Sequence, residues 1–171
     1  LDVCPPLPSP ESVIRLALER TSAWAKRARA AHRRPDQALF GIVQGGISPV
    51  MRAESARRTA ELEFDGYGIG GLSVGETRAE MLPALAAALE HLPHDRPRYL
   101  MGVGDPASLV EAVSLGVDQF DCVMQTRLGR HGTALTSRGK VHIKNAKNAL
   151  DDSPLDPECR CEVCQRHTRG Y

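Results

Sequence analysis

Residues 98–123, RYLMGVGDPASLVEAVSLGVDQFDCV, contain one complete strand–helix–strand unit. The apolar runs at 98–103 and 117–123 have the composition of short buried strands, and Asp105-Pro106 supplies the cap and the first-turn proline that open a helix. Gly116 then ends that helix. Because the links are short, we expect the two strands to be parallel and joined by a right-handed crossover.

The same alternation extends toward the N-terminus. We expect strands at about 39–43 and 64–69, and helices over about 9–33, 48–63 and 76–92. Ser9 is expected to cap the first of these helices, and Ser48-Pro49 to open the second. Residues 133–143 alternate instead like a β-hairpin with its turn at Ser137-Arg138-Gly139.

Unusual polar and glycine clusters lie directly after the predicted strands. They are Gln44-Gly45-Gly46, Gly70-Gly71-Leu72, Met101-Gly102-Val103-Gly104 and Asp121. The carboxyl ends of parallel strands form the catalytic face of a (β/α)₈ barrel and also the ligand crevice of an open doubly wound sheet, so this pattern fits both folds. A complete barrel needs about 250 residues, so this chain would be the later part of one.

Length and composition limit the class of protein. The 171 residues, 42% of them apolar, suffice for one ordinary core and a small appendage. No apolar run approaches the roughly 18 residues of a membrane span, and the N-terminus lacks the pattern of a signal peptide. We therefore expect neither a membrane-spanning nor a secreted protein.

The distribution of charge is more informative than the net charge of +1. Six basic residues and no acidic one lie between Asp121 and Asp151, namely Arg127, Arg130, Arg138, Lys140, Lys144 and Lys147. A stretch of one sign is typical of phosphate binding. A solvated surface strand and loop explains the composition equally well.

Five cysteines, at positions 4, 122, 159, 161 and 164, include the motif C-x-C-x-x-C. Three thiolates this close in sequence favour a tetrahedral zinc site over a disulfide framework, and they indicate a reducing compartment such as the cytoplasm. A structural zinc takes four ligands. His167, three residues after Cys164, is a candidate for the fourth within the chain.

Asp121 ends its predicted strand and is followed by Arg127 and Arg130. A carboxylate at a strand end beside a cationic loop suits covalent attack on a polyanionic substrate. The commoner role of an isolated aspartate at such a position is to cap the next turn. The local chemistry alone does not decide between the two.

Five ordered motifs resemble those of the tRNA-guanine transglycosylases: LDVC at 1–4, GIVQGG at 41–46, GIGGLSVGE at 68–76, YLMGVG at 99–104 and FDCVMQTRLGR at 120–130. The resemblance spans nearly the whole chain. It implies that residues 1–150 are part of a (β/α)₈ TIM-barrel catalytic domain with an inserted β-hairpin. Residues 151–171 would then begin a zinc-binding subdomain.

The resemblance implies a pentosyltransferase of queuosine biosynthesis in which Asp121 is the nucleophile. In this family the matching aspartate attacks C1′ of the wobble guanosine in GUN anticodons and expels guanine. The incoming base, prequeuine (7-aminomethyl-7-deazaguanine), then displaces the covalent RNA–enzyme ester. A carboxylate suits a transition state with oxocarbenium character. Met124-Gln125 departs from the family pattern of an apolar residue followed by proline, which would loosen the loop after Asp121.

The resemblance assigns seven residues to the base: Asp2, Cys4, Gln44, Gly70, Gly71, Leu72 and Met101. Asp2 would accept two hydrogen bonds from the guanine edge, while Gln44 offers its amide to the base carbonyl. Backbone groups of the Gly-Gly-Leu turn contact the base, and the Met101 thioether lies against its plane. Cys4 and Val74 stand where bacterial members accommodate prequeuine.

The resemblance also implies the partners of the chain. They are a tRNA anticodon loop near Arg127 and Arg130, a second copy in a homodimer, and a structural Zn²⁺ on Cys159, Cys161 and Cys164. The family's fourth zinc ligand is a histidine that would lie beyond Tyr171, and its proton-transferring aspartate would lie upstream of Leu1. Alternatives are an archaeosine-type transglycosylase, a non-catalytic RNA-binding accessory homologue, and an unrelated zinc-ribbon module that binds nucleic acid through its basic stretch.

Overall fold

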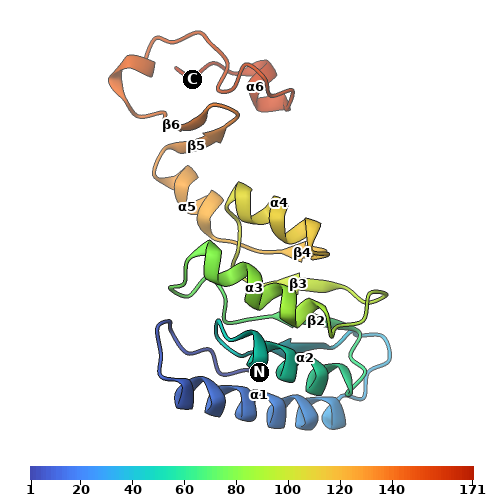
Figure 1. The fold of residues 1–171 in the computed structure, drawn as a ribbon. Coiled ribbons are helices and arrows are strands. Elements are labelled where there is room, and N and C mark those ends of the chain that lie inside the picture. The colour runs from blue at the N-terminus through green and yellow to red at the C-terminus, as the bar shows by residue number, and fades with distance from the viewer. The chain divides into compact units, whose positions relative to one another are not determined.

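A computed structural model describes residues 1–171 as two units, residues 1–122 and residues 123–171. The first contains a four-stranded sheet with its helices, and the second contains a two-stranded hairpin and the cysteine motif (Figure 1). The hairpin therefore groups with the cysteines, whereas the sequence suggested a boundary after residue 150. None of the helices is both long and apolar enough to cross a membrane.

The first unit alternates helices and strands along the chain. In order they are α1 (Glu11–Ala31), β1 (Phe40–Val43), α2 (Pro49–Ala60), β2 (Gly66–Ile69), α3 (Arg78–Leu89), β3 (Arg98–Leu100), α4 (Pro106–Ser114) and β4 (Gln119–Phe120). The strands pair in parallel in the order β1-β2-β3-β4, with Val43 opposite Ile69 and Leu100 opposite Phe120. The α/β architecture with a parallel sheet is thus confirmed.

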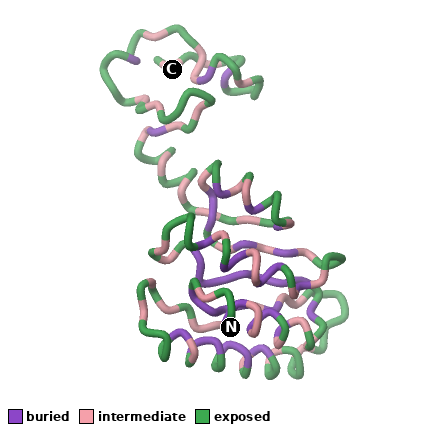
Figure 2. Tube along the Cα trace, in the orientation of Figure 1, coloured by how far each residue is buried: buried purple, intermediate pink, exposed green.

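The main core lies between the sheet and the helices α2, α3 and α4, which run along the sheet (Figure 1). Val43 of β1, Ile69 of β2 and Leu100 of β3 are fully buried, and they meet small or branched residues such as Ala84 and Leu85 of α3. Figure 2 shows this burial concentrated on the strands and on the inner faces of the helices. The core therefore fixes the strand ends from which the candidate site projects.

Helix boundaries follow the capping chemistry at most positions. Ser48 and Asp105 accept backbone hydrogen bonds at the starts of α2 and α4, and Thr77 forms a capping box with Glu80 at the start of α3. The expected cap by Ser9 is wrong: Pro10 occupies the N-cap, and the Ser9 hydroxyl instead donates to the Pro6 carbonyl at 2.6 Å.

The strands are shorter than the apolar runs that encode them, most clearly at β4. Residues 117–123 were expected to be extended, but only Gln119–Phe120 pairs with β3. The Gly102 amide, just beyond β3, donates to the side chain of Asp121 at 2.8 Å rather than to a strand partner. The ladder therefore stops where the site begins.

The second unit consists of α5 (Met124–Arg130), β5 (Thr133–Thr136), β6 (Gly139–His142), a 3₁₀ turn at Ala146–Asn148 and α6 (Glu162–Arg166). The predicted hairpin is confirmed, with β5 and β6 antiparallel. The loop expected after Asp121 is wrong, because a two-turn helix stands there. Its residues are mostly good helix formers, and Gly132, at φ +74°, allows the chain to turn after it.

Candidate active site

Four strand ends contribute to a single edge of the sheet. Gln44, Gly70, Met101 and Asp121 directly follow β1, β2, β3 and β4. Because neighbouring strands are parallel, their carboxyl ends meet at this edge. The four side chains or turns that the sequence singled out therefore lie in a row.

Asp2 joins this row through Gln44. The Gln44 Nε2 donates to Asp2 Oδ2 at 2.7 Å, and the buried Gln44 is itself fixed by a hydrogen bond from its backbone N–H to Ser55 Oγ at 3.0 Å. The N-terminal segment is anchored by the Val3 amide, which donates to Thr21 Oγ1 of α1 at 2.9 Å. These contacts bring Asp2 and Gln44 together, with Asp2 Oδ1 still open to a donor.

The turn after β2 requires glycine at two successive positions. A Cβ on Gly70 would lie 2.9 Å from Gln44 Nε2 and 3.5 Å from Asp2 Oδ2. Gly71 has φ +67°, and a Cβ there would overlap Gln44 Oε1 and lie 3.0 Å from Gln44 Cδ. The turn therefore presents bare backbone beside the Asp2–Gln44 pair, as close approach to a ligand demands.

Glu76 stabilises the next residues of this loop. Its carboxylate accepts the backbone N–H of Ser73 and, at 3.0 Å, that of Val74. Ser73 has φ +67°, a strained value for a residue with a side chain. The sequence offered Glu76 only as part of the VGE motif, and its role in holding the loop becomes visible only in three dimensions.

Met101, at the end of β3, lies between the Asp2–Gln44 pair and Asp121 in this row. Its sulfur packs against the neighbouring strand, 3.4 Å from where a Cβ on Gly68 would stand. The side chain is half-buried, so part of the thioether remains accessible. The thioether therefore offers an apolar, polarizable contact at the centre of this row.

The Asp121 carboxylate is held by one of its oxygens. Oδ1 accepts the Tyr99 hydroxyl at 2.6 Å and the Gly102 backbone N–H at 2.8 Å. These two donors, the hydroxyl first, hold the pKa of Asp121 below its ordinary value, and the same contact raises the pKa of Tyr99 to about 12. The carboxyl is exposed and ionised, and Oδ2 is open to a substrate.

Sequence reasoning missed the contribution of Tyr99. It was quoted only as the first residue of YLMGVG, but its position two residues before Met101 was an available signal. Side chains alternate along a strand, so Tyr99 and Met101 share a face and both belong beside Asp121.

A buried cation under the same edge was also missed. Arg52 of α2 is fully buried, and its guanidinium donates only to backbone carbonyls at the end of β1 and in the loops that follow β1 and β2. In the sequence it is one of three arginines on a helix, and nothing in its spacing separates it from the surface residues Arg57 and Arg58.

In the second unit, the three cysteines of the C-x-C-x-x-C motif are brought together. The sulfurs of Cys159, Cys161 and Cys164 all lie within 4.8 Å of one another. Sulfurs on a tetrahedral zinc, at Zn–S of about 2.3 Å, would be roughly 3.8 Å apart, so the cluster can hold such an ion with small adjustments. The Cys164 amide lowers the pKa of Cys161, whereas burial raises that of Cys164.

The internal candidate for a fourth ligand does not join this cluster. The potential metal group consists of the three cysteines, and the ring of His167 instead stacks on Tyr171 with centroids 4.3 Å apart. Arg127 and Arg130 are exposed on α5, three positions apart and hence on one face of that helix.

Comparisons with known proteins agree with these features. The sequence model of the family described as queuine tRNA-ribosyltransferase matches residues 1–171. Proteins named queuine tRNA-ribosyltransferase are 51% identical over 170 residues in Halothermothrix orenii and 53% identical over 171 residues in Geobacillus kaustophilus. Each alignment covers 99% of this chain but only 46% and 45% of the relative. The chain thus spans about half the length of the curated relatives that it matches, and it belongs to the queuine tRNA-ribosyltransferase family.

Proposed function

We propose that this chain is part of a tRNA-guanine transglycosylase that exchanges the wobble guanine of GUN anticodons for prequeuine in queuosine biosynthesis. The observation that carries the proposal is Asp121, held through Oδ1 with Oδ2 open, on the sheet edge that also bears the Asp2–Gln44 pair. β1 and β4 are three strand spacings apart, roughly 14 Å.

The chemistry follows from the state of the carboxylate. Oδ2 of Asp121 attacks C1′ of the ribose and forms an ester bond while the C1′–N9 bond breaks, and guanine leaves with that electron pair. An anionic oxygen is needed because charge at C1′ becomes positive in the transition state. The hydrogen bonds from Tyr99 and Gly102 keep Asp121 ionised and fix its direction, and an incoming base reverses the step.

Base recognition would use the opposite end of the row. Asp2 Oδ1 can accept from the N1–H and exocyclic amine of a guanine-type base, a charge-assisted pairing that is stronger than one between neutral groups. Gln44 and the Gly70-Gly71-Leu72 turn face the carbonyl side, and Met101 covers the ring. Cys4 and Val74 would accommodate the aminomethyl group of prequeuine.

We infer that residues 1–150 contribute to a (β/α)₈ barrel and residues 151–171 to a zinc-binding subdomain. Helices α2, α3 and α4 flank the sheet in the manner of the outer ring of a barrel, whereas a doubly wound sheet carries helices on both faces. The alternating half-burial along β1 and β3 supports this, since the half-buried residues would line the barrel interior.

The second unit would bind zinc and RNA. We infer a structural Zn²⁺ on the three cysteines, where it would contribute folding free energy rather than chemistry. Arg127 and Arg130 would contact phosphates of the anticodon loop. The functional protein is proposed to be a homodimer.

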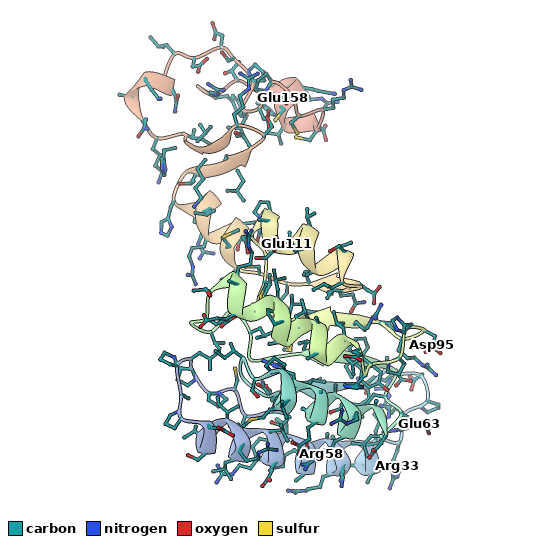
Figure 3. The ribbon with its side chains drawn as sticks, viewed as in Figure 1. Arg33, Arg58, Glu63, Asp95, Glu111 and Glu158 are labelled. Carbon is teal, nitrogen blue, oxygen red and sulfur yellow. The ribbon has the colours of Figure 1, made fainter.

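The test is an Asp121→Asn substitution in the full-length protein. The amide keeps the shape but lacks the anionic oxygen, so we expect normal tRNA binding, no covalent RNA–protein ester on a denaturing gel, and no exchange of labelled guanine. Asp95→Asn is the matched control, a surface carboxylate ahead of β3 at the opposite edge of the sheet (Figure 3). An undiminished ester in Asp121→Asn would assign the nucleophile elsewhere. A wild-type protein that binds tRNA without exchanging any base would indicate the non-catalytic homologue.

A further inference from the structure

Arg52 is a fully buried cation beneath the candidate base site. Its Nε donates to Gly46 O at 2.7 Å, and its two terminal nitrogens donate to Val43 O at 3.3 Å, Gly70 O at 2.6 Å and Gly71 O at 2.9 Å. Burial lowers the pKa of Arg52 to about 10, still far enough above neutrality to keep the charge. No carboxylate bonds directly to the guanidinium, and the nearby charge of Glu76 only partly offsets the cost of burial, so a purely structural link would be better made by a neutral side chain.

The position of the guanidinium dictates the direction of two backbone amides. In a trans peptide the N–H points opposite to the C=O. Because the carbonyls of Gly70 and Gly71 point at Arg52, the N–H groups of Gly71 and Leu72 must point away from it.

These two amides have no acceptor within the chain, although Gly71 and Leu72 are both buried. Buried backbone donors are almost always paired, so two adjacent unpaired donors require an acceptor from outside the chain. The turn that carries them also touches Gln44 and Asp2. Asp2 can accept hydrogen bonds from N–H groups of the same ligand. The missing acceptor is therefore an oxygen next to N–H donors, as in the lactam edge of a 6-oxopurine.

We propose that Arg52 is a positioning residue that aims the Gly71 and Leu72 amides at the carbonyl oxygen of the bound purine. The inference rests on the proposed function, because it takes a guanine-type base as the ligand of the pocket. It adds a specific claim: Arg52 contributes to recognition of the 6-oxo group and not to recognition of the N1–H and amino groups, which belong to Asp2.

The test compares two bases that differ only at that atom. 6-Thioguanine keeps the N1–H and the exocyclic amine of guanine but offers sulfur, a weaker acceptor, in place of oxygen. We would measure equilibrium dialysis of radiolabelled guanine with 6-thioguanine as competitor, using full-length wild type, Arg52→Met and Arg52→Lys. This binding readout does not depend on the covalent step.

Wild type should prefer guanine by about tenfold, the order expected for one or two neutral hydrogen bonds. Arg52→Met should lose most of this preference, and Arg52→Lys, which keeps the charge but reaches fewer carbonyls, should retain part of it. Asp2→Asn should weaken both bases and keep the preference. Arg58→Met, at a half-buried arginine on the same helix that pairs with Glu54, is the matched control and should leave the preference between the two bases unchanged (Figure 3).

The possible outcomes distinguish a failure of the positioning role of Arg52 from a failure of the proposed function. If a folded Arg52 variant lost affinity for guanine and 6-thioguanine by the same factor, the preference would be intact. This result would overturn the positioning role and leave the proposed function standing. Failure of the wild type to bind either base would overturn both. Circular dichroism establishes folding, and if Arg52→Met does not fold, the ratio measured for Arg52→Lys decides.

Discussion

A single methyl group at Gly71 should damage the site in two separable ways. Gly71 has φ +67°, and alanine in this left-handed region costs about 1 kcal/mol. The added Cβ would also overlap Gln44 Oε1 and stand 3.0 Å from Gln44 Cδ, so the amide must move. Gln44 is 1% exposed and donates to Asp2, and loss of a hydrogen bond to a charged group costs about 1.5 kcal/mol more.

Gly102→Ala isolates the first of these costs. Gly102 has φ +76°, close to that of Gly71, but a Cβ there would have no neighbour within 4 Å. We expect Gly71→Ala to lower the free energy of unfolding by about 2–3 kcal/mol and Gly102→Ala by about 1 kcal/mol, measured by denaturant unfolding at 25 °C. Only Gly71→Ala should also weaken guanine binding, by about tenfold. Equal losses in the two variants would refute the steric argument.

Three further predictions address the nucleophile, the metal and the RNA surface. Tyr99→Phe removes the donor that lowers the pKa of Asp121, so this pKa should rise, the carboxylate should become protonated at higher pH, and the acid limb of ester formation should move to higher pH in a pH–rate profile. Chelation should remove zinc from the three-cysteine cluster and lower the thermal stability of the protein before it affects chemistry, as followed by metal analysis and calorimetry; freshly purified full-length protein without zinc would contradict this. Arg127→Gln or Arg130→Gln should weaken tRNA binding and reduce its salt slope by roughly one, and an unchanged slope would make that arginine structural.

The sequence predicted most of the first unit because local signals and tertiary packing agree there. Ser48, Asp105 and Gly116 act at the helix ends as their chemistry suggests, and the strand order follows from short links. The helix Met124–Arg130 was missed because two turns are too short to show a period. Ser9 was misjudged because its hydroxyl turns back to donate to the Pro6 carbonyl and Pro10 takes the N-cap position. Such competition between neighbouring groups cannot be read from propensities.

Arg52 could not have been found from sequence for a different reason. Its importance comes from four carbonyls, one at the end of β1 and three in the loops after β1 and β2, that meet only when β1 pairs with β2. Arginine on an amphipathic helix is ordinarily a surface residue, and the helix pattern assigns it no special place. Contacts of this kind belong to tertiary structure alone.

The strand-end loops share one arrangement despite different chemistry. Asp121 is held through Oδ1 and leaves Oδ2 open, and Asp2 is held through Oδ2 and leaves Oδ1 open. The turn after β2 is held through the carbonyls of Gly70 and Gly71 and leaves the amides of Gly71 and Leu72 open. Each group is thus fixed by one atom and presents another. Fixed dipoles need no reorientation when charge develops on a substrate, and this is how such sites stabilise a transition state more than water does. Tyr99, Gln44 and Arg52 are the residues that hold these three groups. A substitution at any of them should therefore alter the chemistry or the base preference while leaving the reacting atoms in place.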